Sequence, residues 1–79
     1  MLFRSRLALS TPVAGRLSLT IVDAAGRRVR DLSRDVAAGP VDLAWDLRDE
    51  SARRVAPGLY FASGRIGSEH VSRTVLVLD

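Results

Sequence analysis

The sequence predicts an all-β fold, an immunoglobulin-like antiparallel β-sandwich of about seven strands. Apolar and polar residues alternate with period 2 over most of the chain, as they do in strands with one buried face. Turn residues interrupt this alternation at intervals of about 8–12 residues, and no segment has a helical period of 3.6. A small open barrel is the alternative fold.

Size and composition favour one soluble globular domain. The chain has 79 residues, of which 47% are hydrophobic and 27% are charged. It contains no cysteine, which excludes disulfides and thiolate metal sites. No apolar run approaches the ~20 residues of a membrane helix, so we expect no membrane insertion. All twelve cations are arginines, and a net charge of +3 sets no strong field.

Residues 16–22 and 41–46 give the clearest strand patterns. Each places three alternate apolar side chains on one face, as a half-buried strand requires. These inward residues are Leu17, Leu19 and Ile21 in the first strand and Val41, Leu43 and Trp45 in the second.

Four further segments are predicted to be strands. Residues 4–10 alternate with Leu7 and Leu9 inward, together with Ser5, and residues 27–32 form a polar strand near a sheet edge. The last two long strands begin at Leu59 and Val71. The unbroken apolar run over residues 75–78 predicts that the final strand is central and covered on both faces.

Turns are predicted at residues 11–15, 23–26, 38–40 and 67–68. In the second turn, the Asp23 side chain can accept hydrogen bonds from the backbone ahead of it, and Gly26 can adopt positive φ. We therefore expect a type I turn closed by a bulge. No internal repeat, low-complexity tract or linker is recognised.

Asp46, Asp49 and Glu50 are the candidate metal ligands, because Ca²⁺ prefers several oxygen ligands from one tight loop. The spacing is not that of an EF-hand, and three arginines bring positive charge into the same loop. A solvated turn whose aspartates cap backbone N–H groups is the favoured interpretation. We expect no metal and no cofactor.

The sequence offers no catalytic constellation. His70 is the only histidine, and Ser63, Ser68 and Ser72 near it have no orienting acid in a recognisable motif. Gly64 and Gly67 open no helix, so they build no phosphate cradle and are interpreted as turn glycines. The chain is therefore not expected to be an enzyme.

Arginines in two segments raise the alternative of nucleic-acid binding. Arg27, Arg28 and Arg30 could contact phosphates, and Arg53 with Arg54 could extend that patch. Few aromatic residues are present to stack on bases, and aspartates are interleaved with the cations. We expect protein partners and no nucleic acid.

Trp45 and Tyr60 are predicted to be structural. Trp45 lies on the inward face of its strand, and its indole N–H needs one acceptor. Tyr60 follows Pro57-Gly58-Leu59 at the start of a strand, where its hydroxyl can bond back to a loop, as in a tyrosine corner.

An ordered set of motifs resembles the immunoglobulin-like domain at the C-termini of many bacterial secreted and surface proteins. This group includes the type A sorting domain of type IX secretion and the similar domain of flagellar hook-capping proteins. The resemblance covers almost the whole chain. The positions that carry it are Pro12, Gly15, Asp23, Gly26, Arg27, Val29, Trp45, Asp46, Val55, Gly58, Tyr60 and Arg73.

The chain departs from this family pattern at several positions. Leu47 and Ala52 replace two loop glycines, which predicts a changed turn at this place. Val22 replaces a common tyrosine, and Asp79 replaces a basic last residue. An Asn-Pro motif that often precedes the first strand is absent.

The resemblance implies that residues 1–79 form one module, the C-terminal part of a larger exported bacterial protein. The leading hypothesis is a non-catalytic sorting or attachment module for type IX secretion, extracellular or at the cell surface, with its export signal outside this chain. The alternative is an assembly module that pairs through edge strands, with RSRLALS (4–10) as the strand that donates or accepts, in a flagellar cap-like assembly or a self-assembling filament. A Ca²⁺- or carbohydrate-binding module is a third class. The partners are accordingly secretion machinery or neighbouring subunits.

Overall fold

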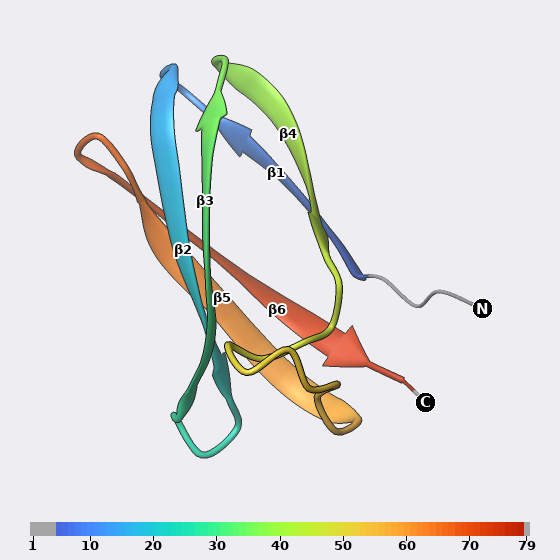
Figure 1. The fold of residues 1–79 in the computed structure, drawn as a ribbon. Coiled ribbons are helices and arrows are strands. Elements are labelled where there is room, and N and C mark those ends of the chain that lie inside the picture. Colours follow the sequence, from blue (N-terminus) through green and yellow to red (C-terminus); the bar gives the residue numbers. More distant parts are fainter. Residues whose placement is uncertain (1–4, 79) are drawn as a thin grey trace.

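The computed structural model describes residues 5–78, with side chains from residue 8 onward (Figure 1). This part of the chain contains six strands, against the prediction of about seven. They are β1 (Ser5–Thr11), β2 (Gly15–Asp23), β3 (Arg28–Val36), β4 (Gly39–Trp45), β5 (Gly58–Ile66) and β6 (Glu69–Val77).

The strands form two antiparallel sheets that face each other, which confirms the predicted sandwich (Figure 1). The larger sheet has the order β3-β2-β5-β6, and the smaller sheet pairs β1 with β4. The larger sheet is built from neighbouring hairpins, whereas β1 and β4 are separated by two strands in sequence. Over the described residues, no helix is long and apolar enough to cross a membrane.

The predicted inward faces of β2 and β4 supply much of the core. All six alternate residues of these two strands are buried, and Trp45 is fully covered. The Trp45 and Tyr60 rings meet edge to face across the two sheets, with centroids 5.5 Å apart and planes at 69°. Leu9 of β1 is also buried. The side chains of Leu7 and Ser5 lie outside the described residues.

The prediction for the last strand is wrong, because β6 is an edge strand. Val75 and Val77 face the core, whereas Leu76 and Leu78 are 60% and 69% exposed. An unbroken apolar run is compatible with burial on one face only, so it did not fix the position of the strand. The polar strand β3 does lie at an edge, as predicted, and it continues to Val36.

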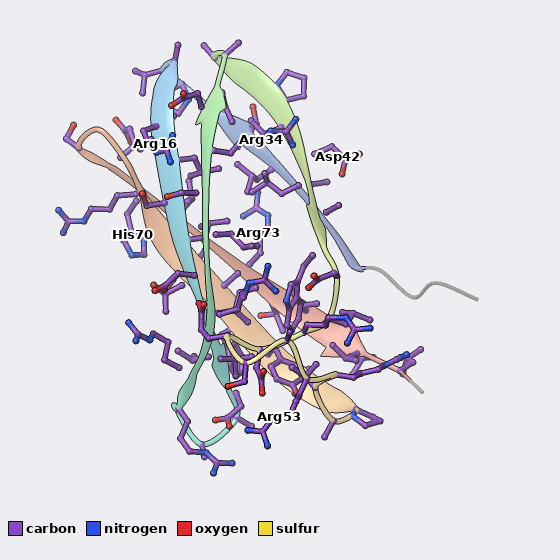
Figure 2. The ribbon with its side chains drawn as sticks, viewed as in Figure 1. Arg16, Arg34, Asp42, Arg53, His70 and Arg73 are labelled. Carbon is purple, nitrogen blue, oxygen red and sulfur yellow. The ribbon has the colours of Figure 1, made fainter. Side chains whose placement is uncertain are left out.

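Two arginines bridge the open sides of the sandwich. From the edge strand β3, Arg34 donates through Nη1 to the carbonyl of Asp42 in β4, at 3.3 Å. From the edge strand β6, Arg73 donates through Nε to the carbonyl of Ala8 in β1, at 3.2 Å. Figure 2 labels both arginines, which extend from the larger sheet toward the smaller one.

Gly64 is not a turn residue, contrary to the prediction, and lies inside β5. A Cβ atom at this position would lie 1.7 Å from the carbonyl oxygen of Ser18 in the neighbouring β2. The glycine is therefore required by the close approach of two backbones. Gly67, with φ of +58°, does lie in the turn between β5 and β6.

Candidate functional site

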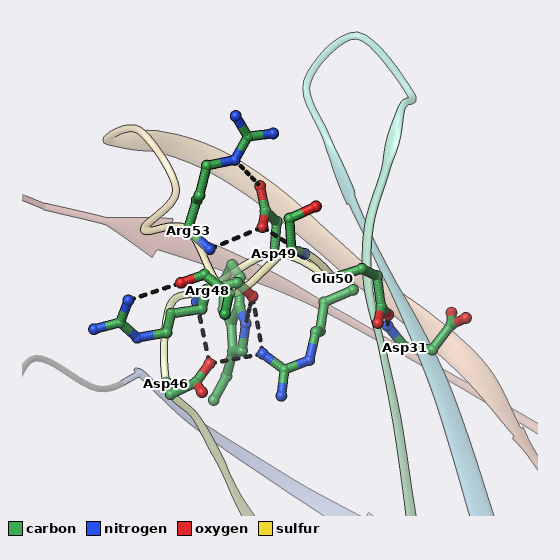
Figure 3. A network of polar contacts seen from close by, with 10 residues as sticks. Asp31, Asp46, Arg48, Asp49, Glu50 and Arg53 are labelled. Carbon is green, nitrogen blue, oxygen red and sulfur yellow. Dashed lines mark hydrogen bonds and ion pairs between the residues drawn. The ribbon is translucent and has the colours of Figure 1, made fainter.

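The acidic loop between β4 and β5 uses its carboxylates to fix its own backbone (Figure 3). Asp46 accepts a hydrogen bond from its neighbour Arg48 N at 3.1 Å, and a further one from Arg30 Nη1 at 2.8 Å. Asp49 accepts from the backbone N–H groups of Ser51 and Arg53 at 2.9 and 3.0 Å. Among residues 5–78, no three acidic or histidine side chains gather closely enough to hold a metal ion.

Glu50 covers part of the exposed edge of β3. Its backbone N–H donates to the carbonyl of Val29 at 3.1 Å, and its carboxylate accepts from the N–H of Asp31 at 2.7 Å. A main-chain donor and a side-chain acceptor thus replace the two bonds that a neighbouring strand would make. The loop is held against β3 by this pair.

The two positions where the resembling family has glycine keep left-handed backbone conformations. Leu47 has φ of +62° and Ala52 has φ of +64°. Both residues adopt the conformation that glycine favours, so a glycine would fit this backbone at either position. That the turn differs from the family's turn stays a prediction. Leu47 is buried in the core, whereas Ala52 is exposed. Burial offsets the strain at the first position only.

Trp45 and Tyr60 make the hydrogen bonds that were predicted for them. The Trp45 indole N–H donates to the carbonyl of Arg48 at 3.1 Å. The Tyr60 hydroxyl donates to the carbonyl of Ala56, four residues earlier, as in a tyrosine corner. Burial raises the pKa of Tyr60 above 10.0, and the nearby Asp23 carboxylate raises it further.

The turn between β2 and β3 has the predicted geometry. Gly26 has φ of +83°, and its N–H donates to the carbonyl of Asp23 at 2.9 Å. The Asp23 carboxylate accepts from the N–H groups of Ala25 and Arg27 at 3.0 and 2.9 Å. The bond from the Arg27 N–H is the main reason that the pKa of Asp23 lies below its ordinary value of 3.8.

The same turn occurs twice in the molecule, a repeat that was not predicted from the sequence. The segments DAAGRRV (23–29) and DESARRV (49–55) share the pattern Asp-x-x-Gly/Ala-Arg-Arg-Val. In both, the aspartate carboxylate accepts from the residues two and four positions later. Aligning these two short segments would have revealed the repeat.

The two turns lie on either side of an open groove of about 480 Å³. Each copy of the pattern contributes its aspartate, both arginines and its valine, and Tyr60 lies between them. The lining residues from the pattern are Asp23, Arg27, Arg28, Val29, Asp49, Arg53, Arg54 and Val55. Of the five arginines considered for phosphate contact, the structure brings these four together, whereas Arg30 bonds to Asp46 and the Arg48 carbonyl.

The histidine and two of the serines considered above lie in the paired strands β5 and β6. His70 is exposed on β6, where it pairs with Arg65 of β5 in the strand ladder. Ser63 and Ser72 face each other across the same two strands. Within the described chain, no hydrogen bond joins His70 to a serine.

Fold and surface together define a class of protein: an immunoglobulin-like β-sandwich with an open cationic groove. The family model of the FlgD Ig-like domain matches residues 4–63, which is more than half of the chain. The chain therefore belongs to the FlgD Ig-like domain family. Matching an FlgD family favours the hook-capping alternative over type IX sorting, which neither the family match nor the similar structures support.

Two solved structures are similar over nearly the whole chain. FlgD from P. aeruginosa is 26% identical with a TM-score of 0.75, covering 94% of this chain and 60% of that one. FlgD from Xanthomonas campestris, described as giving insights into the hook capping essential for flagellar assembly, is 29% identical with a TM-score of 0.71; the match covers 94% of this chain and 56% of that one. The present chain thus spans under two thirds of each FlgD chain. No curated protein matches it significantly.

Proposed function

We propose that this chain is a non-catalytic structural module of a flagellar hook-capping assembly and works outside the cell through contacts with other proteins. The family match over residues 4–63 carries the proposal. Similarity to two FlgD structures over 94% of the chain supports it. That the sandwich is one module of a larger protein stays a prediction.

The outer face of β5 and β6 supports a role in protein contacts. Leu59 and Leu76 are directly opposite each other in the two strands, and Phe61 lies two residues further along β5. These three side chains are 40–60% exposed. Adjacent exposed apolar side chains are typical of surfaces that meet another protein.

The strand first proposed for edge pairing is engaged within the molecule. On one side β1 pairs with β4 from Ser5↔Trp45 to Thr11↔Gly39. On its other side Arg73 bonds to the carbonyl of Ala8. Contact through the apolar face of β5 and β6 is therefore better supported than strand addition at β1.

The test is an in-frame deletion of the coding sequence in the source bacterium, followed by electron microscopy of isolated hook–basal bodies. We expect the deletion strain to lack hooks and the wild-type gene to restore them. Hooks of normal length and number in the deletion strain would contradict the proposal.

A further inference from the structure

We propose that the groove between the two Asp-x-x-Gly/Ala-Arg-Arg-Val turns binds an extended acidic segment of a partner protein. Arg27 and Arg53 are the carboxylate-binding residues. The inference rests on the proposed function only in taking the partner to be a protein, because the groove itself is defined by the geometry of the two turns.

Both arginines are held by the aspartate of their own turn. Arg27 Nε lies 3.0 Å from Asp23 Oδ2, and Arg53 Nε lies 3.9 Å from Asp49 Oδ2. Each aspartate also accepts two backbone N–H bonds, so its position is fixed by the turn. The Arg27 guanidinium is thereby oriented by a hydrogen bond before any ligand arrives, whereas Arg53 has only an ion pair with its aspartate.

The terminal nitrogens of both guanidinium groups point outward. Within the described chain, Arg27 and Arg53 make their side-chain contacts through Nε, and their side chains are 81% and 80% exposed. Figure 3 shows the terminal nitrogens of Arg53 turned away from Asp49. A guanidinium bound at Nε still presents a pair of N–H donors, which match the two oxygens of a carboxylate.

The charge of the groove favours an anionic ligand. Four arginines line it against two aspartates, and one of the four, Arg28, also forms an ion pair with Asp31 at 3.4 Å, so the arginines still outnumber the carboxylates. The Oδ1 atom of each lining aspartate already accepts two backbone N–H bonds. Carboxylates of a bound segment would therefore meet an excess of positive charge. At physiological salt this attraction extends about 8 Å, which is sufficient across a groove of this size.

The floor of the groove fits a peptide better than a nucleic acid. Val29 and Val55 supply apolar surface. Among the described residues, Tyr60 is the only aromatic one that lines the groove, and its ring is buried against Trp45, so it offers no exposed face for base stacking. A second hollow of about 310 Å³ continues past Arg27 to Pro57 and Leu59, where an apolar side chain of the segment would fit.

The test is fluorescence anisotropy of a labelled hexaglutamate peptide titrated with the 79-residue chain in about 0.1 M salt. We expect saturable binding to the wild type. The double variant Arg27→Gln/Arg53→Gln should bind at least about tenfold more weakly, because it lacks two charge-assisted hydrogen-bonding groups.

A charge-matched control is available at the other end of the molecule. Arg16→Gln/Arg65→Gln removes two exposed arginines from the distant ends of β2 and β5; Figure 2 labels Arg16 far from Arg53. The affinity of this control for hexaglutamate should lie within about twofold of that of the wild type, because the removed charges are further from the groove than the electrostatic screening length of the solution. Circular dichroism verifies that each variant is folded.

A third variant tests whether the paired N–H donors of the two guanidinium groups are needed for binding. Arg27→Lys/Arg53→Lys keeps the charge but removes the paired donors. Its loss of affinity for hexaglutamate should lie between those of the other two variants. Equal losses in the control and in the Arg27/Arg53 double variant would overturn the proposal, and so would the absence of saturable binding. Tighter binding of a single-stranded oligothymidylate of equal charge would overturn it in favour of nucleic acid.

The two proposals fail separately. If hexaglutamate does not bind but the deletion strain lacks hooks, only the groove inference is wrong. If the peptide binds at the groove but the deletion strain has normal hooks, the groove is retained and the hook-capping function is wrong.

Discussion

The turns at residues 23–27 and 49–53 have the same hydrogen bonds but differ at their fourth position. In both turns the first residue donates its N–H to the carbonyl of the fifth, and the fourth donates back to the carbonyl of the first. Gly26 occupies the fourth position of one turn and Ala52 that of the other, with φ of +83° and +64°. The aspartate therefore defines this turn, and glycine only lowers its conformational cost.

The largest expected effect lies just before the second turn, at Leu47. Leu47→Ala should lower the free energy of unfolding by about 2–5 kcal/mol, because a buried leucine is lost while the left-handed backbone remains. Leu47→Gly should cost about 1 kcal/mol less than Leu47→Ala, because glycine relieves the strain at positive φ. Urea denaturation measures both differences.

The expected order of stability of Leu47→Gly and Leu47→Ala is the reverse of the usual one, since a substitution to glycine normally destabilises a protein more than a substitution to alanine. The same two substitutions at buried Leu43, within β4, provide the control. There the glycine variant should be the less stable one. A Leu47→Gly variant less stable than Leu47→Ala would show that strain at this position is negligible.

Exchanging the fourth residues of the two turns tests the comparison directly. Gly26→Ala should destabilise the chain by about 1 kcal/mol, and Ala52→Gly should stabilise it by a similar amount. An added Cβ at Gly26 would meet no atom within 4 Å, so the effect there is one of backbone conformation. Urea denaturation of the two single variants and of the double variant gives the values.

Two further results check the exchange. The double variant should be close to the wild type, because the two sites make no shared contact through their side chains. Ala24→Gly, at an exposed position of the first turn without positive φ, should be mildly destabilising. Stabilisation by Ala24→Gly equal to that by Ala52→Gly would contradict the conformational explanation.

The smallest expected effect is the pH dependence that comes from Asp23. Its pKa is lowered in the folded chain, so its contribution to stability is present above pH 3.8 and is lost as the pH falls through the folded pKa. Asp23→Asn should therefore flatten the fall in stability between about pH 5 and pH 2. Urea midpoints over this range measure the slope, and a slope unchanged by Asp23→Asn would contradict this role.

Much of the sandwich could be predicted from local pattern. Period-2 alternation identified the inward faces of β2 and β4 because side chains in a strand point alternately to the two faces. The place of a strand within a sheet depends on its neighbours, and the apolar run before Leu78 did not contain that information. Likewise, nothing local to Gly64 indicates the backbone of Ser18 beside it.

The groove could not be predicted because it depends on tertiary contacts of the second turn. That turn reaches the first one only because Glu50 bonds to the edge of β3 and Arg30 bonds to Asp46 and to the carbonyl of Arg48. The sequence raised a shared patch of these arginines as an alternative, but it contained no sign of the contacts that bring the two segments together. Their convergence required the loop to fold back across β3.

The pairing of β1 with β4 also has a consequence for the order of folding. The hairpins β2–β3 and β5–β6 close short loops, whereas the pairings β1–β4 and β2–β5 join strands far apart in sequence. We expect the two hairpins to form early, and the pairings β1–β4 and β2–β5 to form later. Because a two-stranded sheet is only marginally stable by itself, we expect β1 to detach from β4 first when the molecule opens, which would expose Leu43 and Trp45 to solvent.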